Sequence, residues 1–143
     1  MELGRFVSAQ EYDYEIALLE IRKGRKQSHW MWYIFPQIQG LGYSPTAQYY
    51  AIENRKEAVE YLKHPILGTR LIEISEALLS LKENDATRIM GYPDDLKLKS
   101  SMTLFYEISK NDIFKKVLDK YFEGEMDDKT LKILRELEIE DGS

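Results

Sequence analysis

The sequence predicts an all-α protein that folds as a single compact domain. Apolar residues recur every three or four positions along most of the 143-residue chain, capping residues precede these stretches, and a single short run has the composition of a β-strand. A chain of this length with 43% hydrophobic residues can bury one core. We expect about seven to eight helices with little or no sheet, in one domain over residues 1–143.

Capping signals precede the helices predicted in the first half of the chain. Residues 8–11 form a capping box, with a serine at the N-cap, and Gly24 suits the end of the helix that follows. The Ser-Pro pair at residues 44–45 is typical of the start of a short helix. A second capping box at residues 54–57 predicts another helix directly after it.

Helical periodicity continues in the second half of the chain. After Pro65, apolar residues keep a spacing of three or four from Leu67 to Leu81, which predicts a helix of about four turns. A single helical turn is expected at residues 86–90, because Gly91 suits its end.

Three further N-caps predict the last three helices. Asp94 or Asp95 is expected to cap a helix that runs to about Ser109. Asn111 is expected to cap the next helix and Asp128 the last one.

The continuous apolar run at residues 30–35 is the exception to this helical pattern. Its composition resembles a strand, but six residues do not decide between a strand and a buried helix. Ser28 would cap a two-turn helix that Pro36 ends. Because the sequence offers no partner strands, and a lone strand leaves its backbone unpaired, we expect helix or irregular structure.

Charge and composition restrict the class of protein. The net charge of −5 argues against general nucleic-acid binding, and the absence of cysteine excludes disulfides and thiol chemistry. Glu2, Arg5 and Glu11 interrupt any signal-peptide core, and no apolar run approaches the roughly 20 residues that span a bilayer. We therefore expect a cytoplasmic protein with no membrane association.

The charges are unevenly distributed along the chain. Residues 21–52 contain no acidic residue, whereas residues 123–143 carry eight acidic and three basic residues. The acidic end is typical of a solvated helix face, with residues 139–143 as a frayed tail. The acid-free segment is more informative, because basic, aromatic and glycine residues gather there.

The segment from residue 26 to residue 44 combines residue types that suit a small anionic ligand. His29 titrates near neutral pH and is the candidate for proton transfer, so it is the one catalytic residue we predict. Lys26 stands three positions earlier and would share its face on a helix, where it would bind an anion. Trp30 and Trp32 offer flat faces for stacking or for pocket walls.

Polar and glycine residues follow in the same segment. Gln37 offers a donor and an acceptor, Gly40 and Gly42 let the backbone approach a ligand, and Ser44 heads a helix whose free N–H groups attract anions. Together these features suit a phosphate-bearing, planar ligand such as a nucleotide. The same residues equally suit a structural role, with the tryptophans in the core, Gln37 bonded to backbone and the glycines in turns.

His64 and a second polar group complete the candidate ligand-binding residues. His64 precedes a predicted helix, whose dipole favours a neutral imidazole that bonds a ligand or caps the helix. On the helix that begins near residue 94, Lys97 would bind an anion, and a cluster of hydroxyls would line the pocket: Ser100, Ser101 and Thr103. Alternatively, Lys97 and Lys99 are solvated, and Asp94 and Asp95 cap the helix. No histidine spacing predicts a metal site.

Several longer stretches of the sequence resemble one bacterial family. They are SHWMWYIFPQIQGLGYS, EAVEYLKHPILGTRL, GYPDDLKLKSSMTLF, TLKILRELE and the opening RFVSAQ. On these stretches the chain is similar to the domain-of-unknown-function family numbered eighteen-ten, whose members are small and mostly helical. The resemblance implies a helical fold, and the family has no established activity or agreed catalytic residues that could be carried over to this chain. The name calpastatin, sometimes given to members, does not suit a short, aromatic-rich chain, because such inhibitors are long and disordered.

Two hypotheses of function follow from the sequence. In the first, the chain binds, and in one version processes, a small anionic, nucleotide-like ligand in a pocket formed by residues 26–44, His64 and the 97–103 helix face. In the second, it is a non-catalytic protein–protein interaction module, in which the aromatic segment is core and an exposed helix face binds the partner. Convergence of the polar candidates on one cleft would favour the first hypothesis, and their scatter would favour the second.

Overall fold

The computed structural model describes residues 3–140, which form nine helices and no β-strand. The all-α fold is therefore confirmed, and the helices exceed the expected seven to eight because three of them are only four or five residues long. The helices are α1 (Gly4–Arg22), α2 (Met31–Ile34), α3 (Pro45–Tyr49), α4 (Arg55–Lys63), α5 (Leu67–Ser80), α6 (Ala86–Met90), α7 (Asp94–Ser109), α8 (Asp112–Phe122) and α9 (Asp128–Glu140).

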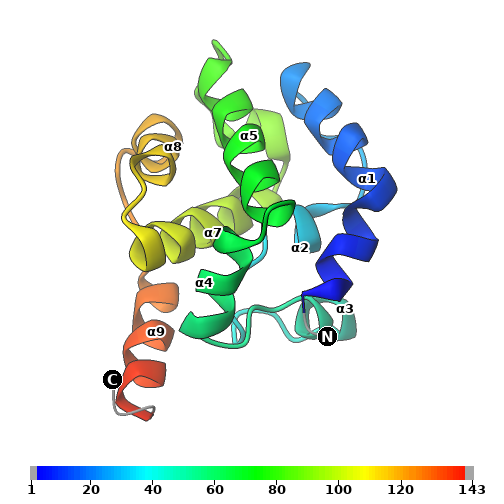
Figure 1. The fold of residues 1–143 in the computed structure, drawn as a ribbon. Helices are drawn as coiled ribbons and strands as arrows, with labels where there is room; N and C mark the ends of the chain where they lie inside the picture. The colour runs from blue at the N-terminus through cyan, green and yellow to red at the C-terminus, as the bar shows by residue number, and fades with distance from the viewer. Residues whose placement is uncertain (1–2, 141–143) are drawn as a thin grey trace.

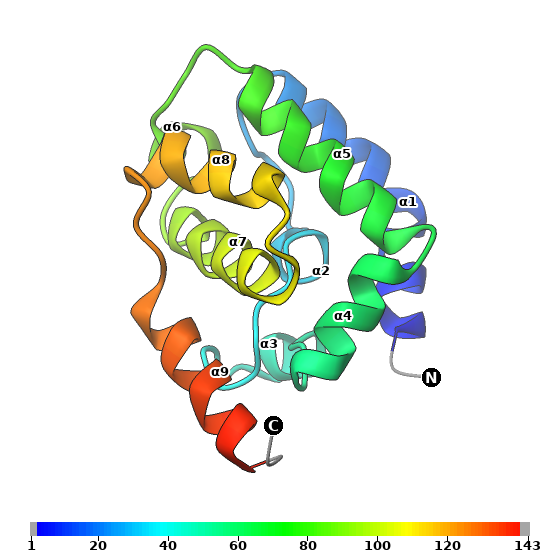
Figure 2. The ribbon, with the colours of Figure 1, turned by 60° about the vertical axis from the view of Figure 1, so that its left-hand side comes forward.

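Helices α2 and α7 lie in the middle of the fold, and the other helices surround them (Figure 2). Helix α7 packs against α4, α6, α8 and α9, while α1 packs against α5 and α2. All six residues from 100 to 105 are buried, because α7 has neighbours on every side. Figure 1 shows α1 and α9 at opposite edges of the molecule.

The predicted caps that act locally are confirmed. The Ser44 hydroxyl accepts a hydrogen bond from Ala47 N at 3.1 Å. The Asn54 side chain accepts one from Glu57 N at 2.9 Å. At the start of α8, Asn111 accepts one from Ile113 N at 3.0 Å. Each bond satisfies an N–H group that the helix leaves without an internal partner.

Two of the predicted helix starts are wrong by a few residues. Helix α1 begins at Gly4, ahead of the capping box at residues 8–11, because the core already buries Phe6 completely. Packing of an apolar face outweighs a local capping signal. The cap of α9 is Asp127 and not Asp128, since its carboxylate accepts a hydrogen bond from Thr130 N at 3.0 Å.

Two other predicted caps use their side chains elsewhere. Ser28 donates to a carboxylate of α1, and α2 is a single turn without a side-chain cap. Asp94 and Asp95 lie inside α7, whose N-cap is Pro93. Asp94 forms an ion pair with Lys26, and Asp95 accepts a hydrogen bond from the Thr87 hydroxyl at 2.6 Å.

The apolar run at residues 30–35 forms the short helix α2, as expected for helix or irregular structure. The chain then continues into one isolated parallel bridge between Ile38 and Ile52. Ile52 N donates to Gln37 O at 2.8 Å, and Gln39 N donates to Ile52 O at 2.8 Å. These two bonds hold the loop of residues 39–44 and helix α3 beside α2.

The two ends of the described chain lie on α1 and α9. Helix α9 continues to Glu140, so residues 139 and 140 of the expected frayed tail are helical, and residues 141–143 lie outside the described residues. Of the helices within residues 3–140, none combines the length and the apolarity that crossing a bilayer requires.

Candidate functional site

Glu20 of α1 fixes the basic segment that leads into α2. Its carboxylate accepts hydrogen bonds from Gln27 N at 2.8 Å, from Ser28 N at 3.0 Å and from the Trp30 indole N–H at 2.9 Å. Burial alone would raise the pKa of Glu20, but these bonds and the Ser28 hydroxyl lower it to about 2. Trp30 is 1% exposed, so the structure places this predicted stacking residue in the core.

Asp94 gathers two of the predicted anion-binding lysines. Lys26 Nζ lies 2.9 Å from one of its carboxylate oxygens, and Lys97 Nζ lies 3.6 Å from the other. Lys26 Nζ is 4.8 Å from the Trp30 ring centroid, and Lys97 Nζ is 5.4 Å from that of Trp32. The structure therefore brings these four predicted residues together, but an acidic side chain stands between the two cations and compensates their charge.

His29 and Trp32 face an open groove of about 580 Å³, which we call the aromatic groove. It lies between α2 with its preceding loop and the short helix α3. Five ring side chains line it: His29, Trp32, Tyr33, Tyr49 and Tyr50. Pro45 and Thr46 complete the lining, so no lysine, arginine or carboxylate contributes to it.

The tyrosines of the groove are held by one another and by α1. The Tyr50 ring centroid lies 5.1 Å from that of Tyr33 and 4.8 Å from that of Tyr49. The Tyr33 hydroxyl donates to Asp13, and burial followed by this hydrogen bond raises the pKa of Tyr33. Burial also raises the pKa of Tyr50. Both phenols therefore stay protonated near neutral pH, and the proton of Tyr33 is already donated within the fold.

Arg5 fixes the far wall of the aromatic groove. Its guanidinium donates to Tyr49 O and Ala51 O, each at 2.7 Å, and forms an ion pair with Glu57 at 2.9 Å. The end of α3 is thereby tied to α1 and α4, while the Tyr49 ring remains 60% exposed. The groove thus has a rigid backbone and accessible rings.

Other predicted site residues lie away from the aromatic groove. His64 Nδ1 accepts hydrogen bonds from Ile66 N at 3.1 Å and Leu67 N at 3.3 Å, so it caps the start of α5. Ser44 caps α3. Gln37 lines, together with Trp32, a separate small cavity of about 20 Å³.

The predicted hydroxyl cluster lies in the core of α7. Ser100 donates to Leu96 O at 3.2 Å, and Thr103 donates to Lys99 O at 2.8 Å. Ser101 is fully buried, and its hydroxyl has no hydrogen-bond partner within residues 3–140. The polar candidates therefore scatter over several parts of the fold and do not form one pocket.

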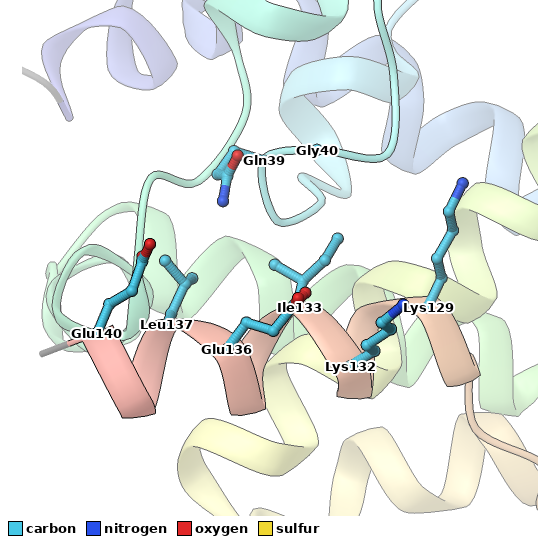
Figure 3. A pocket seen from close by; sticks show the side chains of 8 residues that line it. All are labelled: Gln39, Gly40, Lys129, Lys132, Ile133, Glu136, Leu137 and Glu140. Atoms are coloured by element: carbon cyan, nitrogen blue, oxygen red, sulfur yellow. The ribbon is translucent and has the colours of Figure 1, made fainter. Parts of the chain in front are cut away.

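A second groove, of about 380 Å³, separates α9 from the loop at Gln39 and Gly40 (Figure 3). Its α9 side carries two lysines, two apolar residues and two glutamates: Lys129, Lys132, Ile133, Leu137, Glu136 and Glu140. Sequence reasoning missed this groove, because only the fold brings the loop to α9. A side chain at position 40 would begin 3.3 Å from Ile133 Cδ1, and the φ of +96° also favours glycine, so Gly40 suits this position.

No group of three or more histidine, aspartate or glutamate side chains within residues 3–140 is arranged to hold a metal ion. Within residues 3–140, the hydrogen bond of His29 is at its backbone carbonyl, which accepts from the Tyr33 hydroxyl at 3.3 Å, and not at its imidazole. A general base usually has a neighbour that orients it, and His29 has none in this arrangement. The aromatic groove offers the flat faces of five ring side chains to a ligand.

Comparisons with known proteins give a family and a related fold. The model of the family described as "Protein of unknown function (DUF1810)" matches residues 1–134. The chain is similar to the crystal structure of the conserved hypothetical protein Rv1873 from Mycobacterium tuberculosis, with 44% sequence identity and a TM-score of 0.92. The match covers 94% of this chain and 96% of that chain. No curated protein matches the chain.

Proposed function

The chain belongs to the DUF1810 family, as its sequence motifs predicted, and from this premise we propose that it is a non-catalytic binding module. Its aromatic groove takes an extended, proline-rich segment of a partner protein. One observation carries this function: five ring side chains and Pro45 line one open groove that contains no charged side chain. Aromatic-lined grooves of this kind recognise the polyproline II conformation.

The donors of the aromatic groove match the acceptors of a polyproline II segment. Such a segment makes no internal hydrogen bonds, so its carbonyl groups are available, and its proline rings pack on flat aromatic faces. Trp32, Tyr49 and Tyr50 all line the groove. Each of them combines an apolar ring face with one hydrogen-bond donor, the indole N–H or the phenolic hydroxyl.

A small anionic ligand fits the aromatic groove less well. No cation lines the groove, and Lys26, with a side chain 7% exposed, is already paired with Asp94. Pockets for small molecules usually enclose most of the ligand surface, whereas this groove is open. The second hypothesis from the sequence, an interaction module, is thus the better supported one, with an aromatic groove in place of the acidic helix face as the binding surface.

Titration of the tryptophan fluorescence with decaproline tests this function, because Trp32 lies in the groove and Trp30 is buried. We expect a saturable change with decaproline and none with a glycine-serine peptide of equal length. Tyr49→Ala should weaken binding about tenfold, as expected for an exposed aromatic contact. Tyr43→Ala is the matched control, because this tyrosine is 74% exposed but lies outside the groove.

The same titration distinguishes the anionic-ligand hypothesis. AMP and inorganic phosphate are added in place of the peptide, with His29→Ala as the variant. A saturable response to AMP that His29→Ala removes, together with no response to decaproline, would overturn the proposed function and favour a nucleotide-like ligand.

A further inference from the structure

Helix α1 has apolar residues on two of its sides. Its inner side is buried against α5 and α2. Its outer side exposes Tyr12 by 78%, Ile16 by 44% and Leu19 by 54%. Spacings of four and three residues place these side chains in one stripe along the helix, which we call the outer stripe. A helix that is apolar on two sides is expected to be covered on both.

Helix α1, which carries the outer stripe, lies at the edge of the fold and packs against α5 and α2 (Figure 1). Exposed Glu15 flanks the stripe near its middle, and exposed Arg22 flanks it on the same side two turns later. Exposed Lys23 continues the stripe itself toward the end of the helix. Negative charge thus borders the middle of the stripe and positive charge borders its end.

We propose that the outer stripe is the surface through which two copies of this chain pair, with their α1 helices antiparallel. A two-fold axis can place Ile16 opposite Leu19 of the second copy. The same axis also brings the charged and aromatic residues of the stripe opposite complementary residues. In this register Glu15 comes within reach of Arg22 of the second copy. Tyr12 comes opposite Lys23, where its ring face accepts a cation. Each contact occurs twice by symmetry.

The outer stripe and its charged flanks are complementary to a reversed copy of themselves. We therefore infer that the stripe binds a second copy of this chain. An unrelated partner would need an apolar surface, but it would not require the acidic and basic flanks of α1 to coincide when the helix is reversed. A single register pairs both the apolar residues and the charges. This inference does not rest on the function of the aromatic groove, because none of these residues lines it.

Sedimentation velocity on the full chain, from low micromolar to several hundred micromolar concentration, tests the pairing. We expect the wild type to shift from monomer to dimer over this range. Leu19→Glu should abolish the shift, while Ile139→Glu should leave it intact, because Ile139 is 80% exposed on α9 and far from the stripe along the chain. A wild type that stays monomeric, or equal effects of both variants, would overturn the proposal.

Charge reversal tests the antiparallel register. Glu15→Arg and Arg22→Glu should each weaken the dimer about fivefold, because each single variant places like charges opposite one another. An equimolar mixture of the two variants pairs arginine with glutamate at both positions, so it should dimerise as tightly as the wild type. A mixture no tighter than the separate variants would contradict the register. Circular dichroism checks that all variants remain folded.

Discussion

Trp30 and Trp32 stand two positions apart in one segment but belong to opposite sides of it. Trp30 is 1% exposed and donates its indole N–H to Glu20, so it belongs to the core side. Trp32 is half-buried and lines the aromatic groove, so it belongs to the groove side. The difference comes from distant partners. The Glu20 carboxylate of α1 holds the Trp30 indole in the core by a hydrogen bond, whereas Trp32 faces the open groove between α2 and α3.

The core side and the groove side should differ most in the free energy of unfolding that is lost when each tryptophan is replaced by alanine. Trp30→Ala should lower the free energy of unfolding by about 3–5 kcal/mol, because it leaves a cavity in the core and removes the indole donor from the Glu20 carboxylate. Trp32→Ala should lower it by no more than about 1.5 kcal/mol, because its side chain is partly solvated. Urea denaturation followed by far-UV circular dichroism measures both. Equal losses would show that the two sides do not differ as described.

The carboxylate that holds the core side gives the next largest effect. Glu20→Gln should cost about 2–3 kcal/mol near neutral pH, because the hydrogen bonds from four donor groups would no longer be made to a charged acceptor. The pKa of Glu20 is about 2 in the folded chain and 4.5 without these contacts. The stabilisation is therefore complete above about pH 4.5 and is lost as the pH falls toward 2.

Denaturation with urea at pH 7 and at pH 3 measures this dependence. The wild type should lose more stability than Glu20→Gln between the two pH values. Glu11→Gln is the matched control, because Glu11 lies on the same helix, is exposed and takes no part in the proposed pairing. An unchanged pH dependence in Glu20→Gln would show that the bonds to this carboxylate do not stabilise the fold.

The ion pairs of Asp94 extend the comparison, because Lys26 lies beside the Trp30 ring and Lys97 beside the Trp32 ring. Lys26→Met on the core side should cost about 2 kcal/mol, since Asp94 is largely buried and keeps only the more distant Lys97. Lys97→Met on the groove side should cost about 0.5 kcal/mol, because its side chain is 30% exposed and solvent screens the pair. Similar losses in thermal denaturation would contradict this ranking.

The helices predictable from the sequence are those whose ends depend on neighbouring residues. Asn54 and Asn111 bond backbone groups two or three positions ahead, so a short window of sequence contains the whole interaction. Ser28 and Asp94 are equally good caps by composition, but they bond Glu20 and Lys26, which lie outside any such window. Local chemistry is predictable, and competition from a distant partner is not.

The same limit applies to the candidate site. His29 and Trp32 were predicted and do line one groove, because an aromatic, acid-free segment is visible in the sequence. Tyr49 and Tyr50 were missed as site residues, although two adjacent tyrosines at the end of a short helix are a signal. The hydroxyls of α7 were predicted as pocket walls because polar residues in an apolar pattern suggest a site, and nothing local indicates a helix buried on every side.

Replacing the fully buried Ser101 is expected to have a small effect on the free energy of unfolding, and it tests the core at α7. Its buried hydroxyl has no partner within residues 3–140, so its burial costs free energy that no hydrogen bond returns. Ser101→Ala should therefore be neutral or raise the free energy of unfolding by up to about 1 kcal/mol. Thr103→Val is the control, because the Thr103 hydroxyl accepts a hydrogen bond from Asp127 N at 2.9 Å and its removal should destabilise the fold. If urea denaturation showed that Ser101→Ala destabilises as much as Thr103→Val, the Ser101 hydroxyl would have a partner, and this part of α7 would contain a polar site after all.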